Sequence, residues 1–388
     1  MQWTPEIDAA RLRVLADLAR QATERRPGEE MGWERYATAL ANAGDTAERI
    51  AVLAEAVTRL PHSALLQTSY ARALLAAERF DESVGAARAA VAIAPEDAKA
   101  RQALFEALVA ARKGDEAQGL VALIADDEPP AGSFLDSYAR AVGPEETIAQ
   151  CDTYLAQRPG HTDAHFHKAL ALAQLGRDEE ARAVMMREDA VSISDLQLPA
   201  GFDSIETFNA ALAAEIRADP SLKPDPRAKA TRGGQQTDIT NRTRRPTMSA
   251  LLRAIQQAVD AYEAARATSS DPIFVHRPRR AKLVSWAVIY GRDGRQVAHR
   301  HPDGWISGVY YVAAPRENGR NAYQGPLILG ALDPVQHKVA TPPWGVQEIE
   351  PVPGRLLLFP SFLPHATEPT GIDGARISVA FDVVPDNG

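Results

Sequence analysis

The sequence predicts an α + β chain of two domains: an N-terminal all-α solenoid of helical repeats, followed by a double-stranded β-helix of the jelly-roll, or cupin-like, kind. Two observations predict this order. Small residues and prolines recur every 34 positions through the first half, whereas after Asp271 short apolar runs alternate with Gly and Pro. A chain of 388 residues has room for two or three separate cores.

The composition is typical of a globular protein of the cytoplasm. Apolar residues make up 45% and charged residues 24% of the chain. The net charge of −8 argues against binding to nucleic acid, because neutralising phosphates needs concentrated Lys and Arg. Cys151 is the single cysteine, which excludes an intramolecular disulfide and favours a reducing compartment. No long apolar run or secretory leader is recognisable, so neither a membrane span nor export is expected.

Four sets of residues recur together at an interval of 34 in the first half of the chain. They are Pro27, Pro61, Pro95 and Pro129; Tyr36, Tyr70, Leu104 and Tyr138; Ala39, Ala73, Ala107 and Ala141; and Leu40, Leu74, Leu108 and Val142. This period, with two alanine-rich helical segments per unit, resembles the tetratricopeptide repeat (TPR). Each proline ends the second helix of a unit because it has no N–H to continue it.

The repeats are expected to stack, because one helix pair cannot bury its apolar face alone, and the groove of such a solenoid usually binds peptide. A protein or peptide partner is therefore the first expectation. In the alternative interpretation the array only buttresses the second domain or mediates a homodimer.

Two features of the repeats could be mistaken for functional sites. His161 and His165 have a spacing that a zinc site on a helix could use, but the start of a helix explains them more simply. Cys151 lies in a helical run and is expected to be a small buried residue, not a nucleophile.

We expect the helical repeat domain over residues 1–190, a connecting region over 191–247 and the β domain over 248–388. The connecting region is rich in Pro, Gly and polar residues and is interpreted as a linker or cap. A helix should follow from Met248. Strands are then expected at 282–291, 305–314, 325–333, 345–352, 354–361 and 376–384.

A run of possible metal ligands lies in the β domain. His299, His301 and Asp303 are spaced two apart, and His365 follows at a distance. Alternate residues of a strand point to the same side, so neighbours in this run can reach one metal. Ligands on one face with the opposite face open are typical of non-heme Fe(II) oxygenases. No catalytic residue is expected beyond the ligands of the metal and of the cosubstrate.

Arg376 begins a strand, RISVAFD, in which it shares one face with Ser378. Its guanidinium offers a fixed fork for the far carboxylate of 2-oxoglutarate, and Ser378 and Tyr311 are expected to assist it. The alternative for Arg376 is a surface salt bridge. Trp286 and Trp305 are expected to pack in the core.

The segments RGGQQT, HRHPDGWISGVYYV, FPSFLPHATEP and RISVAFD, in this order, resemble the bacterial TPR-containing 2-oxoglutarate–Fe(II) (2OG-Fe(II)) oxygenase family. The resemblance implies Fe(II), with 2-oxoglutarate and O2 as cosubstrates. It leaves two ligand sets open. The pattern of this family implies His299, His301 and His365, whereas the general pattern of the superfamily implies His301, Asp303 and His365. In the first set, Asp303 accepts a hydrogen bond from a ligand imidazole.

The sequence thus predicts a 2-oxoglutarate-dependent dioxygenase, a hydroxylase, that acts on a protein or peptide recruited by the repeats. Three alternatives remain. One is a hydroxylase of a small molecule whose repeats dimerise. Another is a three-His thiol dioxygenase, which has no use for Arg376, and the third is a scaffold without catalytic activity.

Overall fold

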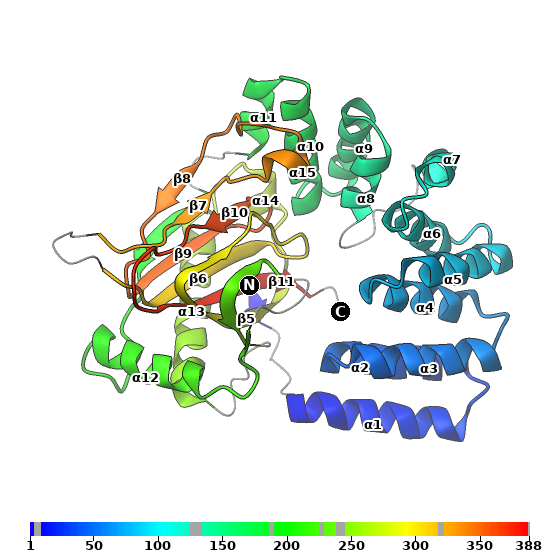
Figure 1. The fold of residues 1–388 in the computed structure, drawn as a ribbon, viewed down its shortest axis with the longest axis horizontal. Coiled ribbons are helices and arrows are strands. Elements are labelled where there is room, and N and C mark those ends of the chain that lie inside the picture. Colours follow the sequence, from blue (N-terminus) through cyan, green and yellow to red (C-terminus); the bar gives the residue numbers. More distant parts are fainter. Residues whose placement is uncertain are drawn as a thin grey trace. The chain divides into compact units, whose positions relative to one another are not determined.

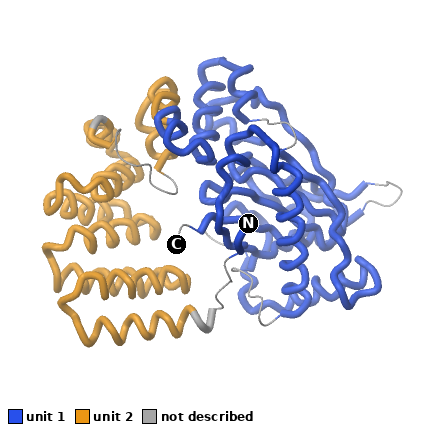
Figure 2. Tube along the Cα trace, turned by 180° about the vertical axis from the view of Figure 1, so that it is seen from behind, with its two compact units in different colours: residues 1–6, 151–388 blue, residues 7–150 orange. Residues whose placement is uncertain are grey.

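A computed structural model describes residues 1–3, 9–124, 134–185, 190–224, 229–237, 245–316 and 322–386. The chain divides into two compact units (Figure 2). One contains residues 7–150, and the other contains residues 1–6 and 151–388. The division falls within a helix, α9 (Pro144–Gln157).

The first unit is a succession of helix pairs, as the repeat pattern predicts (Figure 1). Its other helices are α1 (Ala9–Arg25), α2 (Glu30–Ala43), α3 (Thr46–Arg59), α4 (Ala64–Ala76), α5 (Phe80–Ile93), α6 (Ala98–Ala110), α7 (Gly114–Ile124) and α8 (Phe134–Ala141). The positions from Tyr36 to Tyr138 that repeat at intervals of 34 fall on α2, α4, α6 and α8 in turn, which confirms the repeat. Pro129 lies outside the described residues.

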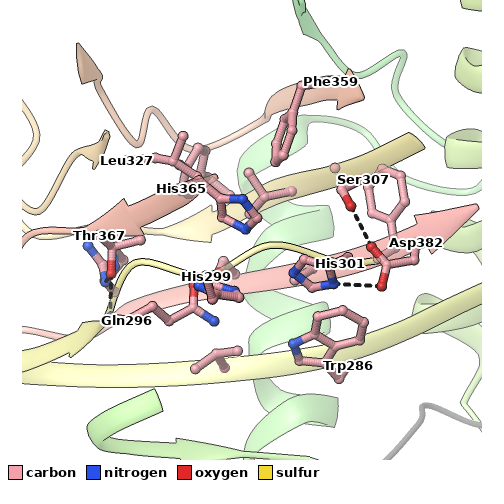
Figure 3. A pocket seen from close by; sticks show the side chains of 18 of the residues that line it. Trp286, Gln296, His299, His301, Ser307, Leu327, Phe359, His365, Thr367 and Asp382 are labelled. Atoms are coloured by element: carbon pink, nitrogen blue, oxygen red, sulfur yellow. Dashed lines mark hydrogen bonds and ion pairs between the residues drawn. The ribbon is translucent and has the colours of Figure 1, made fainter. Parts of the chain in front are cut away.

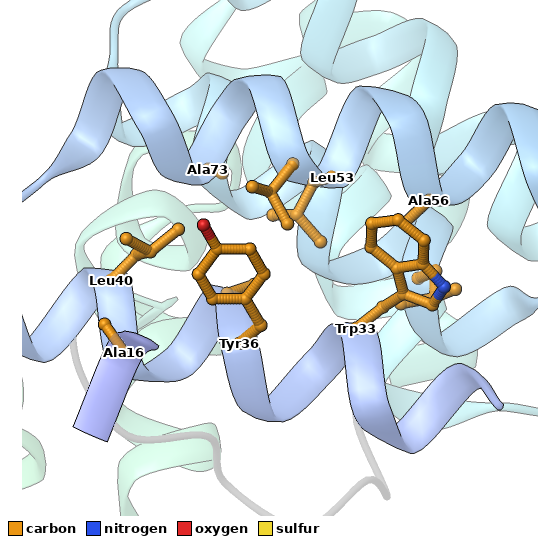
Figure 4. Close-up of a cluster of buried hydrophobic side chains, with 10 residues drawn as sticks. Ala16, Trp33, Tyr36, Leu40, Leu53, Ala56 and Ala73 are labelled. Carbon is orange, nitrogen blue, oxygen red and sulfur yellow. The ribbon is translucent and has the colours of Figure 1, made fainter. Parts of the chain in front are cut away.

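The repeat pattern places large and small residues in one core (Figure 4). Trp33, Tyr36 and Leu40 come from α2 and pack in a cluster with Leu53 and Ala56 of α3. Leu53 and Ala56 are completely buried. Because Ala56 carries only a methyl group, its helix can lie close to the large side chains of α2. The small residues of the repeat therefore set the spacing of the helices.

The second unit is built on two sheets (Figure 1). The larger follows the order β2-β9-β6-β11-β5-β4-β3, with β1 beside β5, and the smaller follows β10-β7-β8. All pairs are antiparallel except β1 with β5. The strands are β1 (Gln2–Trp3), β2 (Ser192–Asp195), β3 (Lys223–Pro224), β4 (Thr231–Gln236), β5 (Arg280–Gln296), β6 (Ile306–Ala313), β7 (Leu327–Leu329), β8 (Gln347–Ile349), β9 (Arg355–Pro360), β10 (His365–Thr367) and β11 (Arg376–Pro385). All six expected strands form, and the antiparallel two-sheet fold confirms the predicted class.

The expected connecting region, 191–247, contributes to the larger sheet. β2 pairs with β9, and β4 pairs with β5. The sequence of β4 is polar, so it lacks the alternating apolar residues that predict a strand. The strand forms because its backbone hydrogen-bonds to β5, and its glycines let the two strands pack closely. A Cβ at Gly234 would lie 2.6 Å from the ring of Tyr290. The described residues of this region are therefore part of the sheet domain.

Helices accompany the sheets in the described part of this unit. They are α10 (Thr162–Gln174), α11 (Asp178–Met185), α12 (Ile205–Arg217), α13 (Pro246–Ala265), α14 (Pro272–Val275) and α15 (Pro334–His337). Although α10 and α11 continue the helical pattern, they belong to the same compact unit as the sheets. Thr162 donates to the carbonyl of Gly304 at 3.1 Å, and Arg182 donates to the carbonyl of Pro343 at 2.8 Å. The compact units thus divide earlier than the expected boundary at residue 190.

In the described part of the chain, no helix is long and apolar enough to span a membrane. The 20-residue helix α13, for example, carries Arg253, Asp260 and Glu263 along its length.

Candidate metal centre

A narrow cavity is lined by residues of both sheets (Figure 3). β5, β6, β9 and β11 contribute from the larger sheet, β7 and β10 from the smaller, and two histidines from the segment between β5 and β6. The residues predicted to bind a metal or cosubstrate, apart from Asp303, all line it: His299, His301, His365, Arg376, Ser378 and Tyr311.

Backbone pairing between two distant segments brings the three histidines together. The N–H of His299 donates to the carbonyl of His365 at 3.0 Å, and the N–H of His365 donates to that of His299 at 2.8 Å. The N–H of His301 donates to the carbonyl of Ser361 at 3.1 Å. One ligand atom from each imidazole lies within 4.8 Å of the other two. Among the described residues, no other group of three His, Cys, Asp or Glu side chains has this geometry.

Hydrogen bonds at Nδ1 determine which nitrogen of each imidazole can bind a metal. Nδ1 lies 2.8 Å from a backbone carbonyl in His299 and 3.1 Å from one in His365. In His301 it lies 2.7 Å from Oδ2 of Asp382. Carbonyl and carboxylate oxygens can only accept, so each Nδ1 carries the proton and each Nε2 keeps its lone pair. Acceptors at Nδ1 are how proteins usually orient metal-binding imidazoles.

Two of these histidines are held in the neutral form. Burial, followed by the charge of His301, lowers the pKa of His299 to about 4. Burial, followed by the charges of His299 and His301, lowers the pKa of His365 well below its usual range. Neutral imidazoles can bind a metal ion without first releasing a proton.

Asp303 lies away from this cluster. It falls in a turn after His301, its side chain is exposed, and it does not line the cavity. Asp382 instead provides the carboxylate beside His301, and it also accepts from the hydroxyl of Ser307 at 2.6 Å. This geometry favours the three-His set over the set with Asp303. It also makes Asp382, rather than Asp303, the acceptor for an imidazole.

Arg376 is a buried cation that faces the same cavity, with only 1% of its surface exposed. Its guanidinium donates to Thr367 at 2.8 Å, to the carbonyl of Glu368 at 2.9 Å and to that of Gly325, and it lies 4.6 Å above the ring of Tyr290. No carboxylate pairs with Arg376 in the described part of the chain. Burial lowers its pKa, yet a guanidinium stays charged in proteins. A buried charge without a counter-ion is costly, so an anion in the cavity would stabilise it.

Tyr311 offers an unused donor in the cavity. It is 2% exposed, and its hydroxyl has no hydrogen-bond partner among the described residues. Burial raises the pKa of Tyr311, so the hydroxyl keeps its proton. Ser378 is its direct neighbour across β6 and β11. A free hydroxyl and a buried guanidinium fit one carboxylate of a dicarboxylic acid, while three Nε2 atoms fit a metal ion.

Sequence reasoning missed two residues beside the histidines. Asp382 lies on the face of β11 that carries Arg376, so the alternation along this strand could have located it. Trp286 lines the cavity and stacks on His301, with ring centroids 5.5 Å apart and planes 14° apart. Trp305 does pack in the core, where its Nε1 donates to the carbonyl of Ile273 at 2.8 Å.

The features of the helical half that mimic functional sites have local structural roles. His161 caps α10, because its Nδ1 accepts from the N–H of Ala164 at 3.2 Å. His165 meets the carbonyl of Pro159 at 2.8 Å. Cys151 is completely buried, and burial raises the pKa of its thiol, which disfavours the reactive thiolate.

Comparison with known proteins yields one family match. Residues 284–382 match the model of the family described as "Putative 2OG-Fe(II) oxygenase". Among solved structures, the chain is similar to a prolyl-4-hydroxylase of Pseudomonas putida, with 19% identity, a TM-score of 0.36 and coverage of 56% of this chain and 100% of that one. It is also similar to a TPR protein of Thermus thermophilus, with 17% identity, a TM-score of 0.35 and coverage of 42% and 91%. No curated protein matches significantly.

The matched residues contain the three histidines, Arg376 and Asp382. This family uses Fe(II), with 2-oxoglutarate and O2 as cosubstrates. Residues 284–382 of the sheet domain thus match the 2OG-Fe(II) oxygenase family, and the same chain carries a TPR-like helical repeat domain.

Proposed function

We propose that this protein is an Fe(II)- and 2-oxoglutarate-dependent hydroxylase of a protein or peptide that the helical repeats recruit. One observation carries the proposal. A single cavity holds three imidazoles with free Nε2 atoms and a buried guanidinium that has no carboxylate partner among the described residues.

His299, His301 and His365 would hold the iron through Nε2. Iron and 2-oxoglutarate, when bound, would supply the oxidation of a C–H bond by O2, with one oxygen atom going to the product, the other to succinate, and the C1 carboxylate of 2-oxoglutarate leaving as CO2. The protein orients the ligands. Asp382 keeps the proton of His301 on Nδ1, and the backbone carbonyls do the same for the other two imidazoles.

Arg376 and Tyr311 would bind the C5 carboxylate of 2-oxoglutarate, with Ser378 beside them. The guanidinium is already fixed by Thr367 and two carbonyls, so little side-chain entropy is lost when the anion binds. The apolar walls, among them Leu327 and Phe359, exclude water and strengthen the charge–charge contact.

The repeats support a polypeptide as the substrate. Arg72 of α4 and Glu106 of α6 occupy equivalent positions of successive repeats, and both are half-buried. Burial raises the pKa of Glu106, and the positive charge of Arg72 opposes this shift. Partly desolvated charges on a repeat surface are suited to bind polar groups of an extended chain.

A thiol dioxygenase is the second candidate, because three histidines are also its ligand set. Its chemistry consumes no 2-oxo acid and leaves Arg376 without a role. Formation of succinate therefore distinguishes the oxygenase from the thiol dioxygenase.

The test is to supply the purified protein with Fe(II), 2-oxoglutarate and O2. Succinate is measured, and proteins captured by the full chain are searched for products about 16 Da heavier. Iron-dependent succinate release supports the oxygenase, and its absence together with oxidation of a thiol would overturn it. Heavier small molecules in place of peptides would retain the oxygenase but contradict a polypeptide substrate.

A further inference from the structure

Arg300 lies between two of the proposed iron ligands, but its side chain pairs with α10. Its guanidinium forms an ion pair with Asp163 and donates to Nε2 of His167 at 2.9 Å. It also lies 4.3 Å above the ring of Phe166. The side chains of Arg300 and Asp163 are only 8% and 2% exposed, so this is a buried ion pair.

The same helix contacts both segments that carry the histidines. At its first residue, Thr162 donates to the carbonyl of Gly304, just after His301. One turn later, the ring of His165 lies 5.9 Å from that of Phe362, three residues before His365. Gly304 fits tightly here, since a Cβ would lie 2.4 Å from Oγ of Ser361. α10 therefore supports the histidine segments at three points.

The segment from 299 to 301 needs such support. It is not part of a continuous strand, and its backbone is held by an isolated bridge between His299 and His365 and by one bond from His301. Two Nε2 atoms must nevertheless stay converged on one point. A buried ion pair at the residue between them ties the segment to α10, and such a pair is rigid because breaking it leaves a charge buried.

We propose that Arg300, anchored on Asp163, is a positioning residue that holds His299 and His301 in place for Fe(II), so that α10 completes the metal site. The inference rests on the proposed function, because it assigns the pair a role in metal binding. It also gives a role to the cluster of polar residues at the start of α10. The last helix pair of the repeat pattern, α10 and α11, then contributes to metal binding by the oxygenase domain.

The test measures metal binding in the full chain. We compare the wild type, Asp163→Asn, and the double variant Asp163→Asn/Arg300→Gln, which leaves neither charge buried alone and so remains able to fold. Arg182→Gln is the matched control, because Arg182 lies on the neighbouring helix and holds Pro343 without touching the histidine segments. Fe(II) affinity is measured without O2 by chelator competition, and the visible spectrum of the Co(II)-loaded protein reports the ligand geometry.

We expect the affinity for Fe(II) to fall about 10- to 100-fold in both Asp163 variants, with an altered Co(II) spectrum, at a temperature where circular dichroism shows them folded. Arg182→Gln should match the wild type in both measurements. Wild-type affinity and spectrum in the double variant would overturn the positioning role while leaving the oxygenase intact. An equal loss of Fe(II) affinity in Arg182→Gln and in the double variant would also overturn the positioning role. Any substitution that weakens the packing of these helices would then have the same effect. A wild type that binds neither metal would overturn the proposed function and this inference together.

Discussion

Oδ2 of Asp382 accepts a hydrogen bond from Nδ1 of His301 at 2.7 Å, and Asp382 lies on the same strand and the same face as Arg376. β11 thus carries both the proposed cosubstrate clamp and the group that orients one proposed iron ligand. The strand is paired on both sides, with β5 and β6. Its register therefore sets the distance between the two ends of the cavity.

Replacing Asp382 by Asn keeps the size of the side chain but removes the charge that favours the Nδ1 proton of His301. We expect the affinity for Fe(II) to fall about 10- to 100-fold without loss of the fold. Chelator competition measures it. Asp303→Asn is the matched control, since this carboxylate is exposed and outside the cavity, and it should bind Fe(II) like the wild type. Equal affinities in the two variants would contradict the role of Asp382.

The two ligand sets make opposite predictions for single substitutions. His299→Ala should lose stoichiometric Fe(II), as should His365→Ala, whereas Asp303→Ala should keep it. Elemental analysis of the purified variants decides the question. The reverse ranking of His299→Ala and Asp303→Ala would restore the set that contains Asp303.

The sequence predicted the fold and most of the cavity because both depend on periodic signals. The interval of 34 located the helices from Tyr36 to Tyr138, and alternation along β11 placed Arg376 and Ser378 on one face; both residues line the cavity. Asp382 follows the same alternation, so the face that it shares with Arg376 could have located it in the cavity.

Other features could not be predicted, because they depend on which distant segments meet. The pairing of Arg300 with Asp163 joins residues 137 apart in the sequence. Nothing in the spacing of the polar residues of α10 indicates that partner. For the same reason, the division of the compact units before α10 was not foreseen, and cutting the chain near residue 190 would remove Asp163 from the oxygenase domain.

Arg376→Lys should raise KM for 2-oxoglutarate by about 10- to 100-fold, because a lysine loses the bidentate contact worth roughly 1.5–3 kcal/mol. The change in kcat should be smaller. Steady-state succinate release at varied 2-oxoglutarate gives both constants. Arg316→Lys and Arg355→Lys serve as controls with unchanged KM. If KM for 2-oxoglutarate rose in one of these controls and stayed normal in Arg376→Lys, the control arginine would be the residue that binds the carboxylate.

Two adjacent tyrosines allow a matched test of the cosubstrate site. The hydroxyl of Tyr310 donates to Oδ1 of Asn209 at 2.7 Å, whereas that of Tyr311 has no partner in the described residues. Tyr310→Phe should therefore lower the stability by about 1 kcal/mol and leave KM for 2-oxoglutarate unchanged. Tyr311→Phe should leave Tm unchanged and raise KM several-fold. Thermal unfolding measures the stability, and succinate assays measure KM. A lower Tm with an unchanged KM in Tyr311→Phe would show that Tyr311 does not bind 2-oxoglutarate.

The repeats should affect hydroxylation of a polypeptide but not the turnover of 2-oxoglutarate alone. Arg72→Gln removes a half-buried charge in the first unit, and none of the residues that line the cavity lies there. If this charge binds substrate, kcat/KM for the polypeptide should fall about tenfold or more, the loss expected for a partly desolvated charged contact. Succinate release without substrate should stay the same.

Arg88→Gln is the control, because Arg88 pairs with Glu116 on the surface and exposed pairs contribute little. Product formation equal to that of the wild type in Arg72→Gln, and also in Glu106→Gln, would separate these charges from the substrate. The array would then be assigned to support or dimerisation, and a small-molecule substrate would be favoured.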